Sequence, residues 1–273
     1  MLRAELLKLT TTSASKVALA VGAGGLIVTQ LVSVAVLPAL ASGRLGAVPA
    51  GLGDSIPSLD LVTSAGQLTA LSPLGASGGT GSLGIAVIAI VLMGVLAGTS
   101  DYRFGGIVTT ALAQPSRVRI LMAKAAAAGI AGLVTGAVFA IVSTATLLGT
   151  LAIVATPLAI EPAEIAAVLA RSVLAISCLT VIGLAVGILA RSQLAGVLVM
   201  LGILVLEMIV QSIAQLIVGS MPVWAQLLPL SLTNAMIGIG ASGLSLPAAA
   251  GALLALTAVA LTFAALALRR RDV

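Results

Sequence analysis

Three polar side chains inside an apolar run have the clearest capacity for chemistry. Glu207, Gln211 and Gln215 recur at intervals of four residues, so they form one stripe along a helix. Glu207 stands about 14 residues into its run, which places it about 20 Å deep. A carboxylate at that depth faces a protein interior or a water-filled path, and is a candidate for contact with a substrate or a proton. The alternative is a structural pairing with Arg171 or with a neighbouring hydroxyl group.

Other common chemistries lack the residues they require. The sequence contains no histidine and one cysteine, Cys178, which excludes His-based metal sites and an intramolecular disulfide bond. It contains no G-x-x-x-x-G-K-[ST] phosphate loop, and the glycine-rich stretch 75–84 lacks the lysine and the buried strand of a nucleotide-binding loop. We therefore predict no catalytic residues and no metal ligands, and we do not expect an enzyme.

The composition is that of a membrane protein. Hydrophobic residues make up 60% of the chain and charged residues 8%, whereas about a quarter of residues are charged in soluble domains. Because a transmembrane helix needs about 20 mostly apolar residues, we predict an all-α membrane protein with six spans in a single transmembrane domain, residues 1–273. The predicted spans are 17–40, 84–99, 125–154, 166–190, 194–218 and 248–268.

Two of these spans contain glycine pairs at a spacing of four residues. Gly132 and Gly136 lie in the third span, and Gly183 and Gly187 lie in the fourth. Such pairs allow two helices to approach closely. We expect them at helix contacts, either within the subunit or between two subunits.

The basic residues indicate how the chain is oriented in the membrane. The net charge is +5, but its basic residues lie beside span ends rather than on a soluble face, so no nucleic-acid partner is expected. By the positive-inside rule both termini are cytoplasmic, in a multi-pass protein of the cytoplasmic (inner or plasma) membrane. The basic residues on that side are Arg3, Lys8, Lys16, Arg103, Arg117, Arg119, Lys124, Arg191, Arg269, Arg270 and Arg271.

Residues 1–16 are predicted to form a helix in the membrane interface. Leu2, Leu6 and Leu9 recur at helical spacing with charged residues between them, which suits a helix whose apolar face contacts membrane lipid. A secretory signal peptide is the alternative, with a cleavage site at residues 39–41. Its apolar run is longer than the usual 7–15 residues or so, which favours the interfacial helix.

Two connections between spans carry further predictions. Residues 97–124 form the longest charged interruption, in which the charge-free segment 106–113 lies between a glycine pair and Pro115. This pattern predicts a short surface helix in the first cytoplasmic loop and a new helix that starts at Ser116. Residues 219–247 carry no charge and contain helix-breaking prolines, which predicts re-entrant segments before the last span.

The first cytoplasmic loop resembles that of type-2 ABC transporter permeases (ABC-2 membrane family, drug, peptide or lipid export branch). The residues that carry the resemblance are Ser100-Asp101-Tyr102-Arg103-Phe104-Gly105-Gly106-Ile107, Thr109-Thr110, Gln114-Pro115-Ser116-Arg117 and Lys124. Residues 3–9 and 227–229 resemble the interfacial helix and the re-entrant segment of that family. The family usually has Glu where this chain has Asp101, and Gly-Thr where it has Gly106-Ile107.

The resemblance implies a coupling helix that docks on a separate ATPase subunit. Two permeases, identical or homologous, would pair with two ATPases, and ATP and magnesium would bind in the partner, so no cofactor is expected in this chain. Thr109 to Leu112 would lie at the docking surface, with Asp101, Arg103 and Arg117 at its rim. The implied coupling residues are Asp101, Arg103, Gly105, Gly106, Ile107, Thr109, Thr110, Ala111, Leu112, Gln114, Pro115 and Arg117.

Three functions are compatible with the sequence. The first is an ATP-driven exporter of an amphipathic or hydrophobic molecule (a drug, peptide or lipid-like compound), with Glu207, Gln211 and Gln215 as polar contacts of the substrate path. The second is a stand-alone secondary transporter coupled to protons through Glu207, for which internal repeats are typical; none is visible in the sequence. The third is a membrane immunity or scaffold protein. The coupling-loop pattern favours the exporter.

Overall fold

The chain forms an elongated bundle of helices. The computed structural model describes residues 1–41, 60–75, 84–103, 116–219, 221–239 and 243–270, and all regular structure in these ranges is helical. Five segments are long and apolar enough to cross a membrane: Ser13–Leu40, Arg117–Val154, Pro162–Ala190, Gln193–Ile217 and Leu246–Arg270. These lengths and compositions indicate a multi-pass membrane protein.

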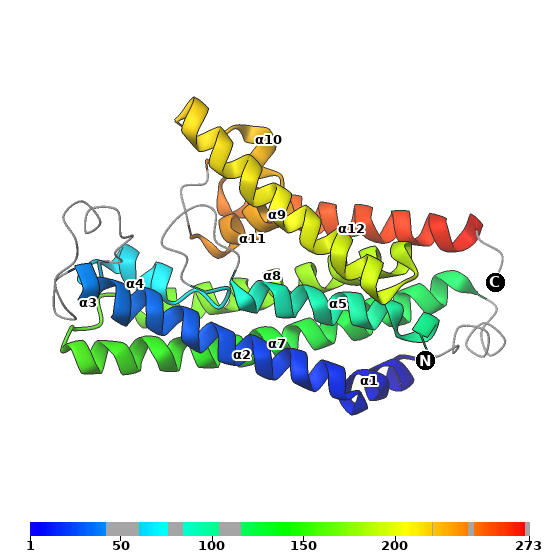
Figure 1. Ribbon diagram of the computed structural model, residues 1–273, viewed down its shortest axis with the longest axis horizontal. Coiled ribbons are helices and arrows are strands. Elements are labelled where there is room, and N and C mark those ends of the chain that lie inside the picture. The colour runs from blue at the N-terminus through cyan, green and yellow to red at the C-terminus, as the bar shows by residue number, and fades with distance from the viewer. Residues whose placement is uncertain (42–59, 76–83, 104–115, 220, 240–242, 271–273) are drawn as a thin grey trace.

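Figure 1 shows how the helices are arranged. In chain order they are α1 (Leu2–Thr11), α2 (Ser13–Leu31), η1 (Val32–Val36), α3 (Leu37–Ala41), α4 (Ser64–Ala70), α5 (Ile85–Arg103), α7 (Arg117–Val154), α8 (Pro162–Ala190), α9 (Gln193–Val218), α10 (Val223–Gln226), α11 (Pro229–Ile237) and α12 (Leu246–Arg270). One end of the bundle holds α1, the last turn of α5, the start of α7 and the last turn of α12. We name it the α1 end, and the opposite end, with α3 and α4, the α4 end.

The all-helical prediction is confirmed for the described residues. Five of the predicted spans match long helices, and the predicted second span matches α5, a shorter apolar helix. α7 follows Ser116, as predicted, and runs for 38 residues from Arg117. The predicted third span, 125–154, is longer in the structure, because its helix begins at Arg117 and includes Arg119 and Lys124. Two short helices, α10 and α11, lie where re-entrant segments were predicted.

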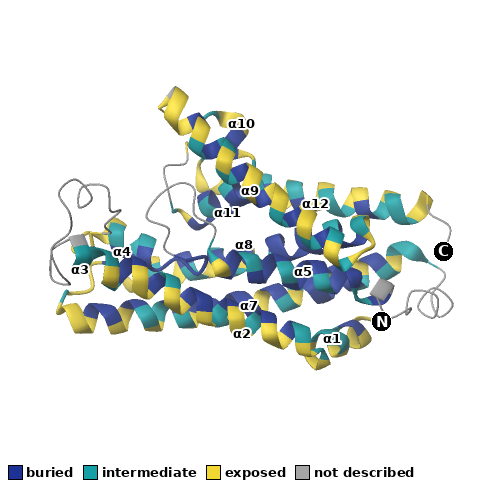
Figure 2. Ribbon diagram, viewed as in Figure 1, coloured by how far each residue is buried: buried dark blue, intermediate teal, exposed yellow. Residues whose placement is uncertain are grey.

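Helix α8 lies at the centre of the bundle. It packs against α5, α7, α9, α11 and α12, and its inner positions, among them Ala175, Ile176, Leu179 and Leu184, are fully buried (Figure 2). Helices α9 and α12 each bury only one stripe and leave large apolar side chains exposed elsewhere. This distribution fits a bundle whose outer surface faces lipid.

Close backbone contacts with α5 occupy one side of α8. A Cβ atom built on Gly183 would lie 2.9 Å from the carbonyl oxygen of Val91, and one built on Gly187 would lie 2.8 Å from that of Val95. Both distances are shorter than a Cβ atom tolerates. The two helices can therefore approach this closely only because both positions are glycine.

The glycines of α7 make the equivalent contact on another side of α8. A Cβ atom on Gly132 would lie 2.7 Å from the Cα of Ser177, and one on Gly136 would lie 2.9 Å from the Cα of Val173. Both glycine pairs found in the sequence therefore lie at contacts within this chain.

Polar side chains connect α2, α7 and the turn after α4. The Nε2 group of Gln30 donates to the carbonyl oxygens of Ala70 (3.0 Å) and Ser72 (3.3 Å) and to Oγ of Ser143 (2.6 Å). That hydroxyl donates in turn to the carbonyl oxygen of Leu71 (2.5 Å). Because the Ser143 proton is used in this way, the hydroxyl must accept from Gln30, which fixes the orientation of the amide.

We predict that Gly94→Ala destabilises the bundle. A Cβ atom at this position would lie 2.2 Å from the carbonyl oxygen of Thr180, and such overpacking costs about 1–3 kcal/mol of unfolding free energy. The control is Gly202→Ala on α9, where nothing lies within 4 Å of the new atom. Thermal unfolding of the detergent-solubilised protein should show a lower midpoint for Gly94→Ala only. Equal midpoints would contradict the close α5–α8 contact.

Candidate functional site

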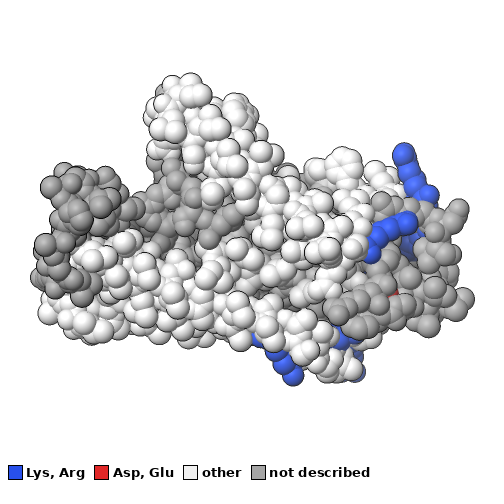
Figure 3. Space-filling model, in the orientation of Figure 1, with Lys and Arg blue, Asp and Glu red and all other residues white. Residues whose placement is uncertain are grey.

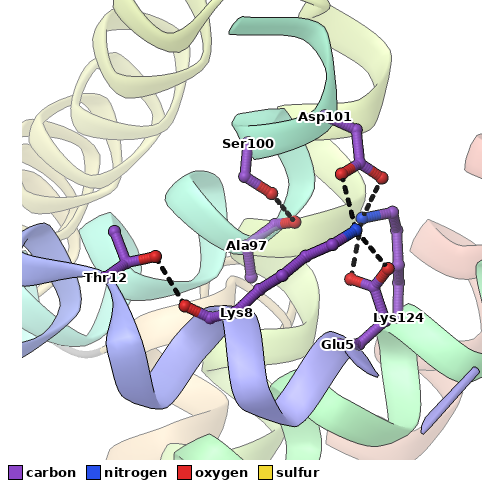
Figure 4. Close-up of polar contacts among 7 residues, drawn as sticks. All are labelled: Glu5, Lys8, Thr12, Ala97, Ser100, Asp101 and Lys124. Atoms are coloured by element: carbon purple, nitrogen blue, oxygen red, sulfur yellow. Dashed lines mark hydrogen bonds and ion pairs between the residues drawn. The ribbon is translucent and has the colours of Figure 1, made fainter. Parts of the chain in front are cut away.

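Four charged side chains form a closed ring at the α1 end. Nζ of Lys8 lies 2.9 Å from Oε1 of Glu5 and 2.9 Å from Oδ1 of Asp101. Nζ of Lys124 lies 3.0 Å from Oε2 of Glu5 and 2.7 Å from Oδ2 of Asp101. Each carboxylate thus contacts both ammonium groups (Figure 4). We name Glu5, Lys8, Asp101 and Lys124 the four-charge cluster.

The cluster joins three helices. Glu5 and Lys8 lie three residues apart on one face of α1, Asp101 lies in the last turn of α5, and Lys124 lies near the start of α7. Thr12 has extended backbone, with φ −71° and ψ 124°, and separates α1 from α2. This break lets α1 turn its charged face toward the bundle instead of continuing the direction of α2.

Burial makes the pairing necessary. Glu5, Asp101 and Lys124 are buried, whereas the Lys8 side chain is 42% exposed, and a buried charge without a partner is strongly unfavourable. Burial by itself would lower the pKa of Lys8, but its hydrogen bonds to Asp101 and Glu5 hold that pKa above the ordinary value of 10.5. The stabilisation from Lys8 is therefore fully present below pH 10.5 and is lost as the pH rises through the raised pKa.

A further charged contact connects α7 to α12. Nη1 of Arg117 donates to the carbonyl oxygen of Leu268 at 2.7 Å. Carbonyl groups in the last turn of a helix lack partners within the helix, and a cation there also complements the helix dipole. The helix ends on both sides of residues 104–115 are thus connected to other helices. The four-charge cluster connects α5 and α7 to α1, and Arg117 connects α7 to α12.

The predicted coupling residues fall into two groups. Asp101 was expected at the rim of a docking surface, and the structure places its carboxylate in the four-charge cluster, buried. Arg117 is half-buried and contacts α12, and Arg103 is the last residue of α5. The others lie outside the described residues, so the coupling helix stays a prediction. They are Gly105, Gly106, Ile107, Thr109, Thr110, Ala111, Leu112, Gln114 and Pro115.

Helix α1 forms as predicted, with a different side facing outward. Leu2 is exposed, but Leu6 is half-buried and Leu9 packs on a core formed by α5, α7, α8 and α12. Leu7 is 64% exposed instead. The prediction turned the face with Leu2, Leu6 and Leu9 toward lipid, whereas the ion pairs of Glu5 and Lys8 hold another face of α1 toward the bundle.

Glu207 and Gln211 form a second polar site, inside the bundle. The Glu207 carboxylate accepts hydrogen bonds from the backbone N–H groups of Leu230 (3.0 Å) and Ser231 (2.6 Å) and from Nε2 of Gln211 (3.0 Å). Gln211 also donates to Oγ of Ser231 at 2.7 Å. Leu230 and Ser231 lie in the first turn of α11, where N–H groups lack partners within the helix. Glu207 therefore caps α11. The third predicted member, Gln215, is exposed.

The other end of α11 lies near the second charge that the sequence places within a span. α11 ends at Gly238, which has φ +90°, and a Cβ atom built there would lie 3.7 Å from Nη2 of Arg171. A carboxylate at the first turn of a helix and a guanidinium near its end both match the helix dipole. Glu207 and Arg171 therefore lie at opposite ends of one short helix and do not form the pair that the sequence left open.

The four-charge cluster and the capping role of Glu207 were not predicted from the sequence. Glu5, Lys8 and Lys124 were interpreted only as interfacial or topological charges. The signal that could have found the cluster is the presence of two acidic residues, Glu5 and Asp101, on a side of the protein that is otherwise mostly basic. In the described ranges no group of three or more His, Cys, Asp or Glu residues is placed to hold a metal ion.

Comparisons with family models, with curated proteins and with solved structures give no match to this chain.

We predict that Lys124→Met strongly destabilises the protein. The substitution leaves two buried carboxylates with one half-exposed lysine, and breaking a buried ion pair costs about 3–5 kcal/mol. The double variant Asp101→Asn/Lys124→Met should lose less than the sum of the single losses, since both partners are removed together. Thermal midpoints should be compared with Arg119→Met, which removes an exposed charge from the same helix. Equal midpoints for Lys124→Met and Arg119→Met would refute the structural importance of the cluster.

We predict that Glu207→Ala loosens α11. It leaves the N–H groups of Leu230 and Ser231 without their acceptor, at about 1–3 kcal/mol each, whereas Glu207→Gln keeps one acceptor oxygen and should cost less. Ser212→Ala is the control, because that hydroxyl bonds within α9 to the carbonyl oxygen of Met208. The readout is again the thermal midpoint. If Glu207→Ala matches the parent in stability but loses transport, Glu207 contacts substrate instead.

Proposed function

We propose that this chain is the membrane-spanning permease subunit of an ATP-driven exporter, of the type-2 ABC class, for an amphipathic or hydrophobic substrate such as a drug, a peptide or a lipid-like compound. It works with two ATPase subunits and with a second permease subunit, identical or homologous. ATP and magnesium bind in the ATPase, and this chain forms the path through the membrane. The sequence of the first cytoplasmic loop supports this proposal.

The observation that carries the proposal is the position of the four-charge cluster. Asp101 lies three residues before the segment 104–115 and Lys124 lies shortly after it. On α1, Asp101 binds Lys8 and Lys124 binds Glu5, and Asp101 and Lys124 also bind each other. A partner that displaces this segment would therefore move α5, α7 and α1 together. Such a connection is what a permease needs if an external ATPase drives its spans.

The proposal includes α5 as the sixth span. α5 has 19 residues, which gives a length of about 28 Å, close to the roughly 30 Å thickness of the hydrocarbon core. An even number of spans agrees with α1 and the last turn of α12 lying at the same end (Figure 1). Exposed Lys and Arg side chains gather at that end (Figure 3), so we assign it to the cytoplasm, with the protein in the cytoplasmic membrane.

Glu207 and Gln211 take a supporting role in this proposal. Their polar atoms already bind the first turn of α11, so they fix the position of a short helix between α9 and α12. The apolar surfaces of the spans then select a substrate with little charge. Transfer of an isolated charged substrate from water into such surroundings would have a large desolvation free energy.

Co-purification with an ATPase tests the proposal. The tagged chain, extracted from its native membrane in mild detergent, should bring down an ATPase subunit and ATP hydrolysis. Thr110→Arg should reduce the recovered ATPase at least about tenfold, since one unpaired buried charge at a docking surface costs well over 1.4 kcal/mol. Thr11→Arg, an exposed position on α1, should not.

Two results would contradict the exporter. If no ATPase co-purifies with the parent, the loop serves only topology. If transport also survives ATP depletion and collapses with an uncoupler, the protein is a proton-coupled transporter.

A further inference from the structure

Charges at the α1 end are separated by sign between the interior and the surface. Both described acidic side chains there, Glu5 and Asp101, are buried in the four-charge cluster, where Lys8 and Lys124 neutralise them. Within the described ranges, the exposed charged side chains at this end are all basic: Arg3, Lys16, Arg119, Arg191, Arg269 and Arg270. Figure 3 shows several of them on one face. Among the described residues, this surface thus carries positive charge and no exposed acidic side chain.

One part of this surface combines basic and exposed apolar side chains. On α1, Arg3 and Leu7 lie four residues apart and share the outward face, opposite Glu5 and Lys8. At the start of α2, Lys16 is followed by Val17 and Val21, which are 59% and 55% exposed. Exposed apolar side chains that follow a cation along the helix match a phospholipid, whose acyl chain follows its headgroup into the membrane.

We propose that the outward face of α1 and the start of α2, defined by Arg3, Leu7, Lys16 and Val17, binds an anionic phospholipid. Arg3 and Lys16 attract the anionic headgroup, and the acyl chain packs along Val17 and Val21. The apolar residues favour a lipid over an acidic soluble protein, because such a protein would leave them in water. Lys16 also lies at the start of a segment long enough to span a membrane, which is the depth of lipid headgroups.

The proposed lipid site and the four-charge cluster lie on opposite faces of the same short helix. α1 has 10 residues, and its inward face holds α5 and α7 through Glu5 and Lys8. A lipid bound on the outward face therefore biases the position of the helix that connects both ends of segment 104–115. Resting on the proposed function, we infer that anionic lipid regulates the coupling of this permease to its ATPase.

Lipid binding is measured on the permease alone, by native mass spectrometry in a detergent with added phosphatidylglycerol or phosphatidylcholine. The parent should retain phosphatidylglycerol in preference to phosphatidylcholine. The double variant Arg3→Gln/Lys16→Gln should lose this preference by about fivefold for each charge removed. The charge-preserving variant Arg3→Lys/Lys16→Arg should keep it. A parent with no preference between the two lipids would overturn the proposal.

A matched variant separates a specific site from the net charge of the α1 end. Arg269→Gln/Arg270→Gln removes the same charge at the same end, but on α12, and should lose less of the preference than Arg3→Gln/Lys16→Gln. Equal losses in the two double variants would show that net charge alone holds the lipid, and would overturn the assignment to α1 and α2.

The regulatory step has its own readout. In vesicles that contain the permease and its ATPase, phosphatidylglycerol should raise ATP hydrolysis for the parent and not for Arg3→Gln/Lys16→Gln. Lipid binding without this difference would overturn the regulatory step alone. Because the binding measurement needs no ATPase, failure to find an ATPase partner would refute the proposed function and leave the lipid site standing.

Discussion

The cost of removing charge from water governs the architecture at the α1 end. Three charged groups of the four-charge cluster are buried, and each would be strongly destabilising without its neighbours. This constraint fixes several features together. α1 must turn at Thr12, it must present Glu5 and Lys8 inward, and the last turn of α5 must lie beside the start of α7. Hydrophobic packing alone would allow an apolar helix in lipid to slide or rotate, since its surroundings are equally apolar.

Within the bundle, close backbone packing replaces the hydrophobic effect as the source of order. Gly183 and Gly187 contact α5 while Gly132 and Gly136 bring α7 against α8. The central helix is therefore held from two sides by contacts that accept no larger residue. At the α4 end, Gln30 and Ser143 add hydrogen bonds between α2, α7 and the turn after α4. Close glycine contacts thus order the helices around α8, and polar contacts order the α1 end and the α4 end.

Much of the fold follows from the sequence, because the length of an apolar run predicts a span directly. The start of α7 after Ser116 also follows from local residue types. The contacts between helices do not follow from the sequence in this way. Helical spacing shows which residues share a face, but it does not show which helix that face contacts. The backbone donors to Glu207 lie 23 and 24 residues away, and Lys124 pairs with Glu5 at a separation of 119 residues. The sequence therefore identified Glu207 as unusual without revealing that it caps α11.

The length of α7 has a mechanical consequence. Its 38 residues form a rod of about 57 Å, nearly twice the thickness of a hydrocarbon core. Its close contact with α8 at Gly136 lies about 18 Å from Lys124 and about 27 Å from Val154. A stiff rod that pivots at this contact acts as a lever whose longer arm points away from the α1 end. If this rod tilted about its glycine contacts with α8, Lys124 and Val154 would move in opposite directions, and Val154 would move farther because it lies farther from Gly132 and Gly136.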